Sequence, residues 1–126
     1  GFVDIKMSNY TAVAVTESGA LYTWGTNNYH GHQSVRNTKL HAPKRLKLRN
    51  DAEDVVIMAK CSQQTCYVLT EEGKIWSWGY NYCGSLGHSG GSTNYTPKAI
   101  EGAIKDKRIV HFDAAYYHCA CIDESG

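Results

Sequence analysis

The hydrophobic pattern of the chain is that of short strands joined by polar turns. β-Branched and small apolar residues fill positions 11–16, a polar turn ending at Gly19 follows, and large apolar residues then alternate with small polar ones over 21–24. Two such runs around a glycine-containing turn indicate a β-hairpin, and the glycine fits the positive φ that closes a three-residue loop. No segment shows three turns of amphipathic helix periodicity. The pattern predicts an all-β protein.

The same hairpin pattern returns at an offset of 54 residues. Residues 6–27 and 60–81 share nine identities in 22 aligned positions. The identical pairs are Lys6/Lys60, Ser8/Ser62, Thr11/Thr65, Thr16/Thr70, Glu17/Glu71, Gly19/Gly73, Trp24/Trp78, Gly25/Gly79 and Asn27/Asn81. A third copy begins near the end, where Cys119, Glu124 and Gly126 match Cys66, Glu71 and Gly73 at an offset of 53. Repeats of this period predict stacked supersecondary units and a function of shape and surface.

The second copy resembles a known repeat. Over 69–87 it reads Leu-Thr-Glu-Glu-Gly-Lys-Ile-Trp-Ser-Trp-Gly-Tyr-Asn-Tyr-Cys-Gly-Ser-Leu-Gly, which is similar to the repeat of the regulator of chromosome condensation family. The resemblance implies consecutive antiparallel blades of a β-propeller, seven-bladed in that family and incomplete in this chain. The family's histidine position holds Thr11 and Thr65, and His118 in the third copy. The structural repeat positions that the resemblance marks are Gly19, Trp24, Gly25, Asn27, Gly73, Trp78, Gly79, Asn81, Gly84, His118 and Gly126.

The period also predicts the domain organisation. We expect repeat one at about 3–55, repeat two at about 56–108 and the start of repeat three at about 109–126, all within one propeller domain. The chain stops at the turn of its third hairpin. We therefore expect a segment of a larger protein, which needs further repeats of the same parent or self-association to cover its open edges.

Charge and cysteine content indicate the compartment. The net charge is only +1, but five basic residues (Lys39, Lys44, Arg45, Lys47 and Arg49) lie within 39–49. This stretch is either a solvated edge or a docking site for acidic protein or phosphate. The sequence has no signal peptide and no apolar run long enough to span a bilayer. Its five cysteines are irregularly spaced, which argues against a secreted disulfide framework. We expect an intracellular protein, cytoplasmic or nuclear, without membrane contact.

The residues that could carry chemistry have bland alternatives. His118, Cys119 and Cys121 could ligate zinc, but the repeat register places both cysteines at small strand positions, where free cysteine packs as a small hydrophobe. His30 and His32 have no carboxylate or cysteine nearby in sequence. The tryptophans fall at repeat positions that favour core and the seam between blades. No phosphate loop, nucleophile elbow or acid/base pair is present, so we expect no enzyme activity, no metal and no cofactor.

Loops on a rigid repeat scaffold are where binding residues accumulate. Candidate partner-binding residues are Tyr29, His30 and His32 in the first copy, His88, Asn94 and Tyr95 in the second, and Lys44 and Arg45 from the basic stretch. The sequence predicts a protein–protein interaction scaffold or adaptor. Two alternatives remain open. The resemblance implies guanine-nucleotide exchange on a small GTPase, as in the family's founding member, and the basic stretch allows chromatin or phosphate binding through 39–49.

Overall fold

The chain folds into three consecutive antiparallel sheets. The computed structural model describes residues 1–8, 10–26, 29–32, 39–62, 64–81, 85–88, 93–115 and 118–126. The first sheet has the order β1 (Phe2–Met7), β2 (Thr11–Thr16), β3 (Leu21–Gly25), β4 (Leu40–Arg45). The second has the order β5 (Val56–Cys61), β6 (Thr65–Thr70), β7 (Ile75–Gly79), β8 (Asn94–Ala99). A 3-10 helix, η3 (Gly102–Ile104), leads to the pair β9 (Ile109–Ala114) and β10 (Cys119–Asp123).

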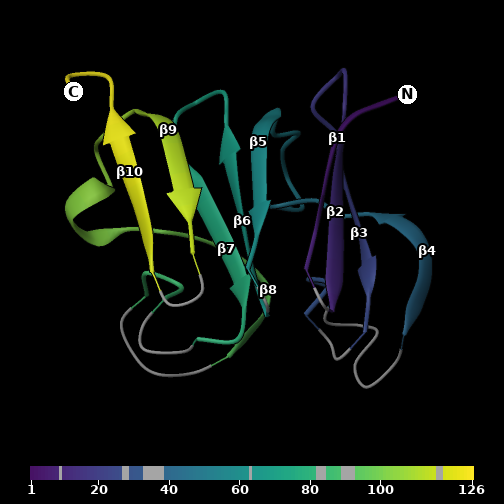
Figure 1. Ribbon diagram of the computed structural model, residues 1–126. Coiled ribbons are helices and arrows are strands. Elements are labelled where there is room, and N and C mark those ends of the chain that lie inside the picture. The colour runs from purple at the N-terminus through teal and green to yellow at the C-terminus, as the bar shows by residue number, and fades with distance from the viewer. Residues whose placement is uncertain are drawn as a thin grey trace.

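The sheets stand side by side in chain order, from purple β1 through teal to yellow β10 (Figure 1). Each four-stranded sheet is a meander, because every strand pairs with the next one in sequence. Among the described residues the only helical element is η3. The all-β prediction is confirmed, and the arrangement is that of neighbouring blades of a β-propeller.

The hairpin glycines join each sheet to the next. Gly19 and Gly73 have φ of +83° and +84°, as the turn pattern predicts. The Gly19 carbonyl accepts a hydrogen bond from the Val56 N–H at 3.0 Å, and the Gly73 carbonyl accepts one from the Ile109 N–H at 2.9 Å. A Cβ on Gly73 would lie 2.9 Å from the Ile109 nitrogen. The glycine is therefore needed for its φ and for the close approach of the next blade.

A second pair of glycines allows a close approach between backbone segments. Gly25 and Gly79 follow the tryptophans of β3 and β7, with φ of +138° and +110°. A Cβ on either would lie 2.2 Å from a carbonyl oxygen, that of Tyr10 or of Gln64 respectively. No side chain fits there, because real Cβ atoms do not approach backbone oxygen so closely.

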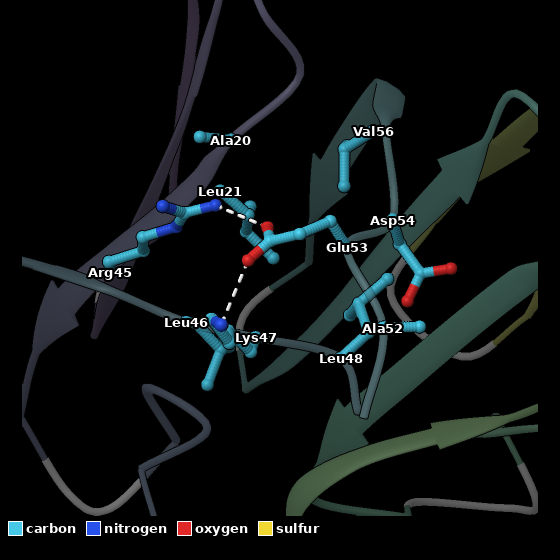
Figure 2. A pocket seen from close by; sticks show the side chains of 10 residues that line it. All are labelled: Ala20, Leu21, Arg45, Leu46, Lys47, Leu48, Ala52, Glu53, Asp54 and Val56. Carbon is cyan, nitrogen blue, oxygen red and sulfur yellow. Dashed lines mark hydrogen bonds and ion pairs between the residues drawn. The ribbon is translucent and has the colours of Figure 1, made fainter. Parts of the chain in front are cut away.

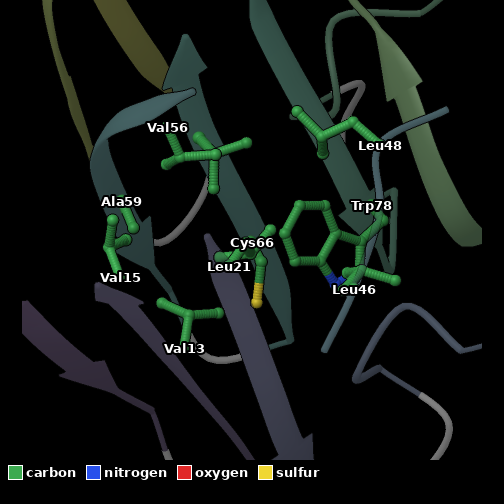
Figure 3. Close-up of a cluster of buried hydrophobic side chains, with 10 residues drawn as sticks. Val13, Val15, Leu21, Leu46, Leu48, Val56, Ala59, Cys66 and Trp78 are labelled. Atoms are coloured by element: carbon green, nitrogen blue, oxygen red, sulfur yellow. The ribbon is translucent and has the colours of Figure 1, made fainter. Parts of the chain in front are cut away.

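A hydrophobic seam holds the first two sheets together (Figure 3). Val13, Val15 and Leu21 come from the first sheet, Val56, Ala59, Cys66, Val68 and Trp78 from the second, and Leu46 and Leu48 from the segment between them. A second cluster joins the second sheet to β9 through Tyr67, Leu69, Ile75, Ile109 and Phe112. Because both faces of β6 are covered, all six of its residues are buried.

The two repeat tryptophans differ in burial, which corrects the expectation that they occupy equivalent buried places. Their register is the same, Trp24 opposite Ala12 and Trp78 opposite Cys66. Trp78 is fully buried in the seam, whereas Trp24 is half-buried. The cause is position in the stack: Trp78 faces the first sheet, but Trp24 lies on the side of the first sheet that faces away from the second.

The first strand of each sheet carries one bulged apolar residue that points to solvent. The pairing register of β1, β5 and β9 steps over Val3, Ile57 and Val110. These three side chains are 60%, 55% and 48% exposed. A bulged residue leaves the ladder and is re-aimed, so these apolar positions do not contribute to either seam.

Candidate interaction surface at the loop end of the blades

Four tyrosines from the turns and strand ends of the first two sheets come together around Tyr29. Tyr10 lies in the β1–β2 turn, Tyr29 between β3 and β4, Tyr80 directly after β7, and Tyr95 in β8. Burial raises the pKa of the Tyr29 hydroxyl, and the phenol groups of Tyr95, Tyr80 and Tyr10 raise it further. Each of the other three phenol groups thus lies close enough to Tyr29 to act on its hydroxyl. Tyr80 is 40% exposed and the others are half-buried. We call these four residues the tyrosine cluster.

The backbone of the tyrosine cluster is held firmly. The Tyr29 carbonyl accepts a hydrogen bond from Trp78 Nε1 at 3.1 Å, across the seam between the sheets. The Tyr10 carbonyl accepts from the Thr26 N–H at 2.8 Å. Tyr80 donates its N–H to the Gln64 carbonyl, and its own carbonyl accepts from Thr65 Oγ1, both at 2.8 Å. These hydrogen bonds fix the backbone at Tyr10, Tyr29 and Tyr80.

The structure places the two candidate histidines of the first copy inside the molecule. His30 is fully buried, its Nδ1 accepts from the His32 N–H at 3.2 Å, and its carbonyl accepts from Thr23 Oγ1 at 2.5 Å. Burial lowers the pKa of His32 to about 4, and the Lys44 cation adds to that shift. His32 is therefore neutral at pH 7. A Cβ on Gly31, between them, would lie 3.0 Å from Trp78 Nε1, so this segment supports the seam.

The three candidate residues of the second copy, His88, Asn94 and Tyr95, are all half-buried. His88 Nε2 lies 3.1 Å from Ser77 Oγ, and burial, followed by the Lys98 cation, lowers the pKa of His88. Asn81 Oδ1 accepts from the Leu86 N–H at 3.0 Å, which ties Leu86 to the end of β7. Asn94 and Tyr95 are half-buried on β8. The marked positions Asn27 and Gly84 lie outside the described residues.

The basic stretch is largely neutralised by its own neighbours. Glu53 binds the Arg45 guanidinium at 2.6 Å and the Lys47 ammonium at 2.8 Å (Figure 2). These cations, Lys47 first, lower the pKa of Glu53. Arg49 holds both carboxylate oxygens of Asp54, at 2.8 and 3.0 Å. Lys39 and Lys44 are exposed and make no ion pair with any residue that the structure describes. Sequence reasoning counted the five cations and missed Glu53 and Asp54, although both follow closely in the chain.

Two cavities adjoin the basic stretch. The one drawn in Figure 2 offers about 10 Å³, roughly the space of one water, and so excludes an organic ligand. The other, of about 540 Å³, lies between the segment after β4 and strand β8. It is lined by Gly31, His32, Arg45, Leu46, Lys47, Leu48, Arg49, Asn50, Thr96 and Pro97. Its three cationic residues are the ones already paired with Glu53 and Asp54.

His118 and the two cysteines of β10 form no metal centre with the other residues that the structure describes. His118 is exposed, Cys119 is half-buried against the second cluster, and Cys121 is exposed, which corrects the expectation that Cys121 packs in the core. Cys121 lies opposite Phe112 on β10, the outer strand of a two-stranded sheet, and its side chain stays exposed there. Within the described ranges no three His, Cys, Asp or Glu side chains come together as metal ligands, and no catalytic feature is present. Nor does any helix there have the length and apolarity to cross a membrane.

The sheet order and the repeated hairpins together define a repeat protein built from β-propeller blades. Models of the regulator of chromosome condensation (RCC1) repeat match residues 2–31 and 72–122. The chain belongs to the RCC1 repeat family, as the sequence pattern predicted.

Curated relatives are much longer proteins. The chain is 30% identical over 112 residues to the E3 ubiquitin-protein ligase HERC2 of Mus musculus, covering 89% of this chain and 2% of that protein. It is 28% identical over 122 residues to the mitochondrial RCC1 domain-containing protein RUG3 of Arabidopsis thaliana, covering 97% of this chain and 27% of that protein. The chain thus spans less than a third of these relatives.

Solved structures confirm the fold. Human WBSCR16 superposes with a TM-score of 0.82 at 20% identity, covering 99% of this chain and 32% of that one. Prp20p from Saccharomyces cerevisiae, reported with its binding properties to Gsp1p and histones, superposes with a TM-score of 0.76 at 12% identity, covering 94% of this chain and 30% of that one. At such identities the likeness concerns the fold alone.

Proposed function

We propose that this chain belongs to a protein–protein interaction scaffold that binds its partner through the tyrosine cluster. The observation that carries the proposal is the gathering of Tyr10, Tyr29, Tyr80 and Tyr95 at one end of the blades. Tyrosine is enriched at protein interfaces, because it offers a large amphipathic ring at a low entropy cost. The raised pKa of the Tyr29 hydroxyl keeps it protonated, so it can donate as well as accept hydrogen bonds.

Preorganisation supports this role. The main-chain hydrogen bonds of Tyr10, Tyr29 and Tyr80 are already made in the unbound protein, so binding would order little backbone. The exposed Lys44 lies near enough to His32 to act on its charge state and would add electrostatic steering toward an acidic partner. In this proposal Tyr29, Tyr95, Asn94 and Lys44 face the partner, while His30, His32 and His88 support the surface and Arg45 is held by Glu53.

Alanine variants of the cluster test the proposal. The larger protein that we expect to contain this chain (the parent protein) and its Tyr80→Ala variant are used to capture partners from cells. The affinity of each identified partner is then measured with purified proteins. The Tyr80 variant keeps both main-chain hydrogen bonds of that residue, so we expect a loss of affinity of tenfold or more without unfolding. Tyr22→Ala is the matched control, since Tyr22 packs on Phe2 in the first sheet. Equal affinity for both variants would refute the tyrosine cluster as the binding surface.

Guanine-nucleotide exchange on a small GTPase is a second candidate. Its support is the fold likeness to Prp20p, whose binding to Gsp1p is reported. An exchange factor of this kind would insert a loop against the nucleotide site of its partner and needs no catalytic group of its own. Release of fluorescent GDP from purified small GTPases, with and without the parent protein, tests it: an unchanged release rate would exclude exchange.

Chromatin or phosphate binding through 39–49 is the third candidate. Prp20p is reported to bind histones, and Lys39 and Lys44 remain exposed. Glu53 and Asp54 already hold the other three cations, so we rank this candidate last. The test is the slope of DNA affinity against salt, which should be about two counterions or fewer if only these lysines bind.

The wider context is also a proposal. We infer one propeller domain of an intracellular protein, cytoplasmic or nuclear, with repeats at about 3–55, about 56–108 and from about 109 onward. The greater length of HERC2 and RUG3 supports this organisation. Limited proteolysis of the parent protein should then leave the repeats together in one resistant fragment.

A further inference from the structure

Two cysteines face each other across the first hairpin of the second sheet. Cys61 ends β5, Cys66 lies near the start of β6, and the two are direct register partners. Their Sγ atoms are 3.1 Å apart. Cys66 is 1% exposed and belongs to the seam, where Figure 3 draws its sulfur beside Val13 and Leu21, and Cys61 is half-buried at the edge of that cluster. The pair is thus both close and reachable from one side.

The repeat itself does not require two cysteines at these positions. The equivalent pair is Met7 opposite Ala12 in the first sheet and Ala114 opposite Cys119 in the third. Apolar residues of different sizes thus satisfy the packing at both positions. Within the described residues, only the β5–β6 hairpin places two thiols directly opposite each other, so packing alone does not account for the pair.

We propose that Cys61 and Cys66 form a redox-active dithiol, which a low-molecular-weight disulfide such as oxidised glutathione converts to a cross-strand disulfide. The thiolate of the more exposed Cys61 attacks the glutathione disulfide, forms a mixed disulfide and releases one glutathione thiolate. The thiolate of Cys66 then attacks the Cys61 sulfur, closes the protein disulfide and releases the second glutathione. The two thiol protons leave on the two glutathione molecules, so the protein loses two electrons and the glutathione disulfide gains them.

The geometry supports this order of events. Directly opposed residues of an antiparallel pair have Cα atoms about 4.5–5.5 Å apart, within the range that disulfides span. The sulfurs need to approach by only about 1 Å to reach the bonded distance of about 2.05 Å. Burial raises the pKa of the Cys66 thiol, which disfavours it as the first nucleophile. Its position next to the Cys61 sulfur makes the second step intramolecular, and this offsets the low thiolate fraction.

Peptide mapping tests the proposal directly. Trypsin cuts after Lys60 and Lys74, so both cysteines fall in the single peptide 61–74. The folded protein is incubated with oxidised glutathione, the remaining thiols are blocked with N-ethylmaleimide, and the tryptic digest is analysed by mass spectrometry. We expect peptide 61–74 to lose two hydrogens and carry no maleimide, and dithiothreitol to restore two maleimide-reactive thiols.

Matched variants keep the test sharp. Cys61→Ala reproduces the alanine of the third hairpin and should abolish the disulfide, while circular dichroism confirms that it folds. Cys121→Ser removes an exposed thiol on β10 and should leave the Cys61–Cys66 disulfide unchanged. The proposal is overturned if peptide 61–74 keeps two maleimides while Cys121 becomes glutathionylated. It is also overturned if glutathione stays attached to Cys61, or if the oxidised peptide is linked to another cysteine.

Discussion

Replacing Trp78 with phenylalanine probes the seam between the first two sheets. The indole is fully buried, contacts side chains of both sheets and donates its N–H to the Tyr29 carbonyl at 3.1 Å. Phenylalanine keeps an aromatic ring but removes the donor and part of the volume. Loss of a hydrogen bond that leaves a carbonyl unpaired costs about 1–1.5 kcal/mol. Trp→Ala at a buried site costs about 3–5 kcal/mol, so the smaller change in ring size adds about 1 kcal/mol. We expect a total of about 2–2.5 kcal/mol.

Urea unfolding of the parent protein, followed by far-ultraviolet circular dichroism, measures this cost without depending on tryptophan fluorescence. With a slope of about 2 kcal/mol per molar urea, the midpoint should fall by about 1 M. Trp76→Phe is the matched control: it lies two residues earlier on β7 but is half-buried at the edge of the seam, and we expect a shift below about 0.4 M from a cost under about 0.8 kcal/mol. Equal shifts for the two variants would refute the conclusion that Trp78 holds the sheets together.

Three further substitutions test the turn, the buried histidine and the bulge. Gly73→Ala forces φ of +84° on alanine and brings its Cβ to 2.9 Å from the Ile109 nitrogen, so thermal unfolding should show a loss of about 2 kcal/mol, against about 1 for Gly102→Ala, whose Cβ meets open space. The pKa of His32 is about 4 in the fold and about 6.5 when unfolded. Its neutral form is therefore stabilising above pH 6.5, and this contribution is lost as the pH falls through 6.5 to 4. His32→Gln should flatten the decline of urea midpoints over that range, and the exposed His41→Gln should leave it unchanged. Ile57→Ser changes a bulged, 55% exposed side chain. Thermal unfolding should show a loss of no more than about 0.5 kcal/mol in the free energy of unfolding; a larger loss would mean that the bulged side chain packs against another part of the protein.

Local features of the fold were readable from the sequence. The hairpins and their positive-φ turn glycines follow from residues that are neighbours in the chain, so the pattern predicted them correctly. Burial depends on what lies across the seam, which a single repeat does not encode. Trp24 and Trp78 have the same sequence surroundings and the same register, yet only Trp78 has a sheet packed over it.

The candidate surface was predicted less completely. Loop position and polarity suggested that His30 and His32 face a partner, but the loop folds beneath Trp78 and buries both. Tyr29 and Tyr95 were named from their loops, whereas Tyr10 and Tyr80 were missed, since the cluster forms only when turns of both sheets meet. Cys61 and Cys66 face each other because of the pairing register between β5 and β6. The repeat alignment marks both positions, but the sequence analysis did not pair them across the hairpin.

The contact between Trp78 and Tyr29 has a consequence for how this surface can evolve. The indole of Trp78 binds the main-chain oxygen of residue 29, not its side chain. Tyr10 and Tyr80 are likewise held through backbone atoms. Any amino acid that tolerates the local backbone supplies the same oxygen, so a substitution at residue 29 can change the side chain while the hydrogen bond between the blades persists. In the scaffold that we propose, selection for a new partner would act on the side chain, and selection for a stable stack would act on the main-chain oxygen of the same residue.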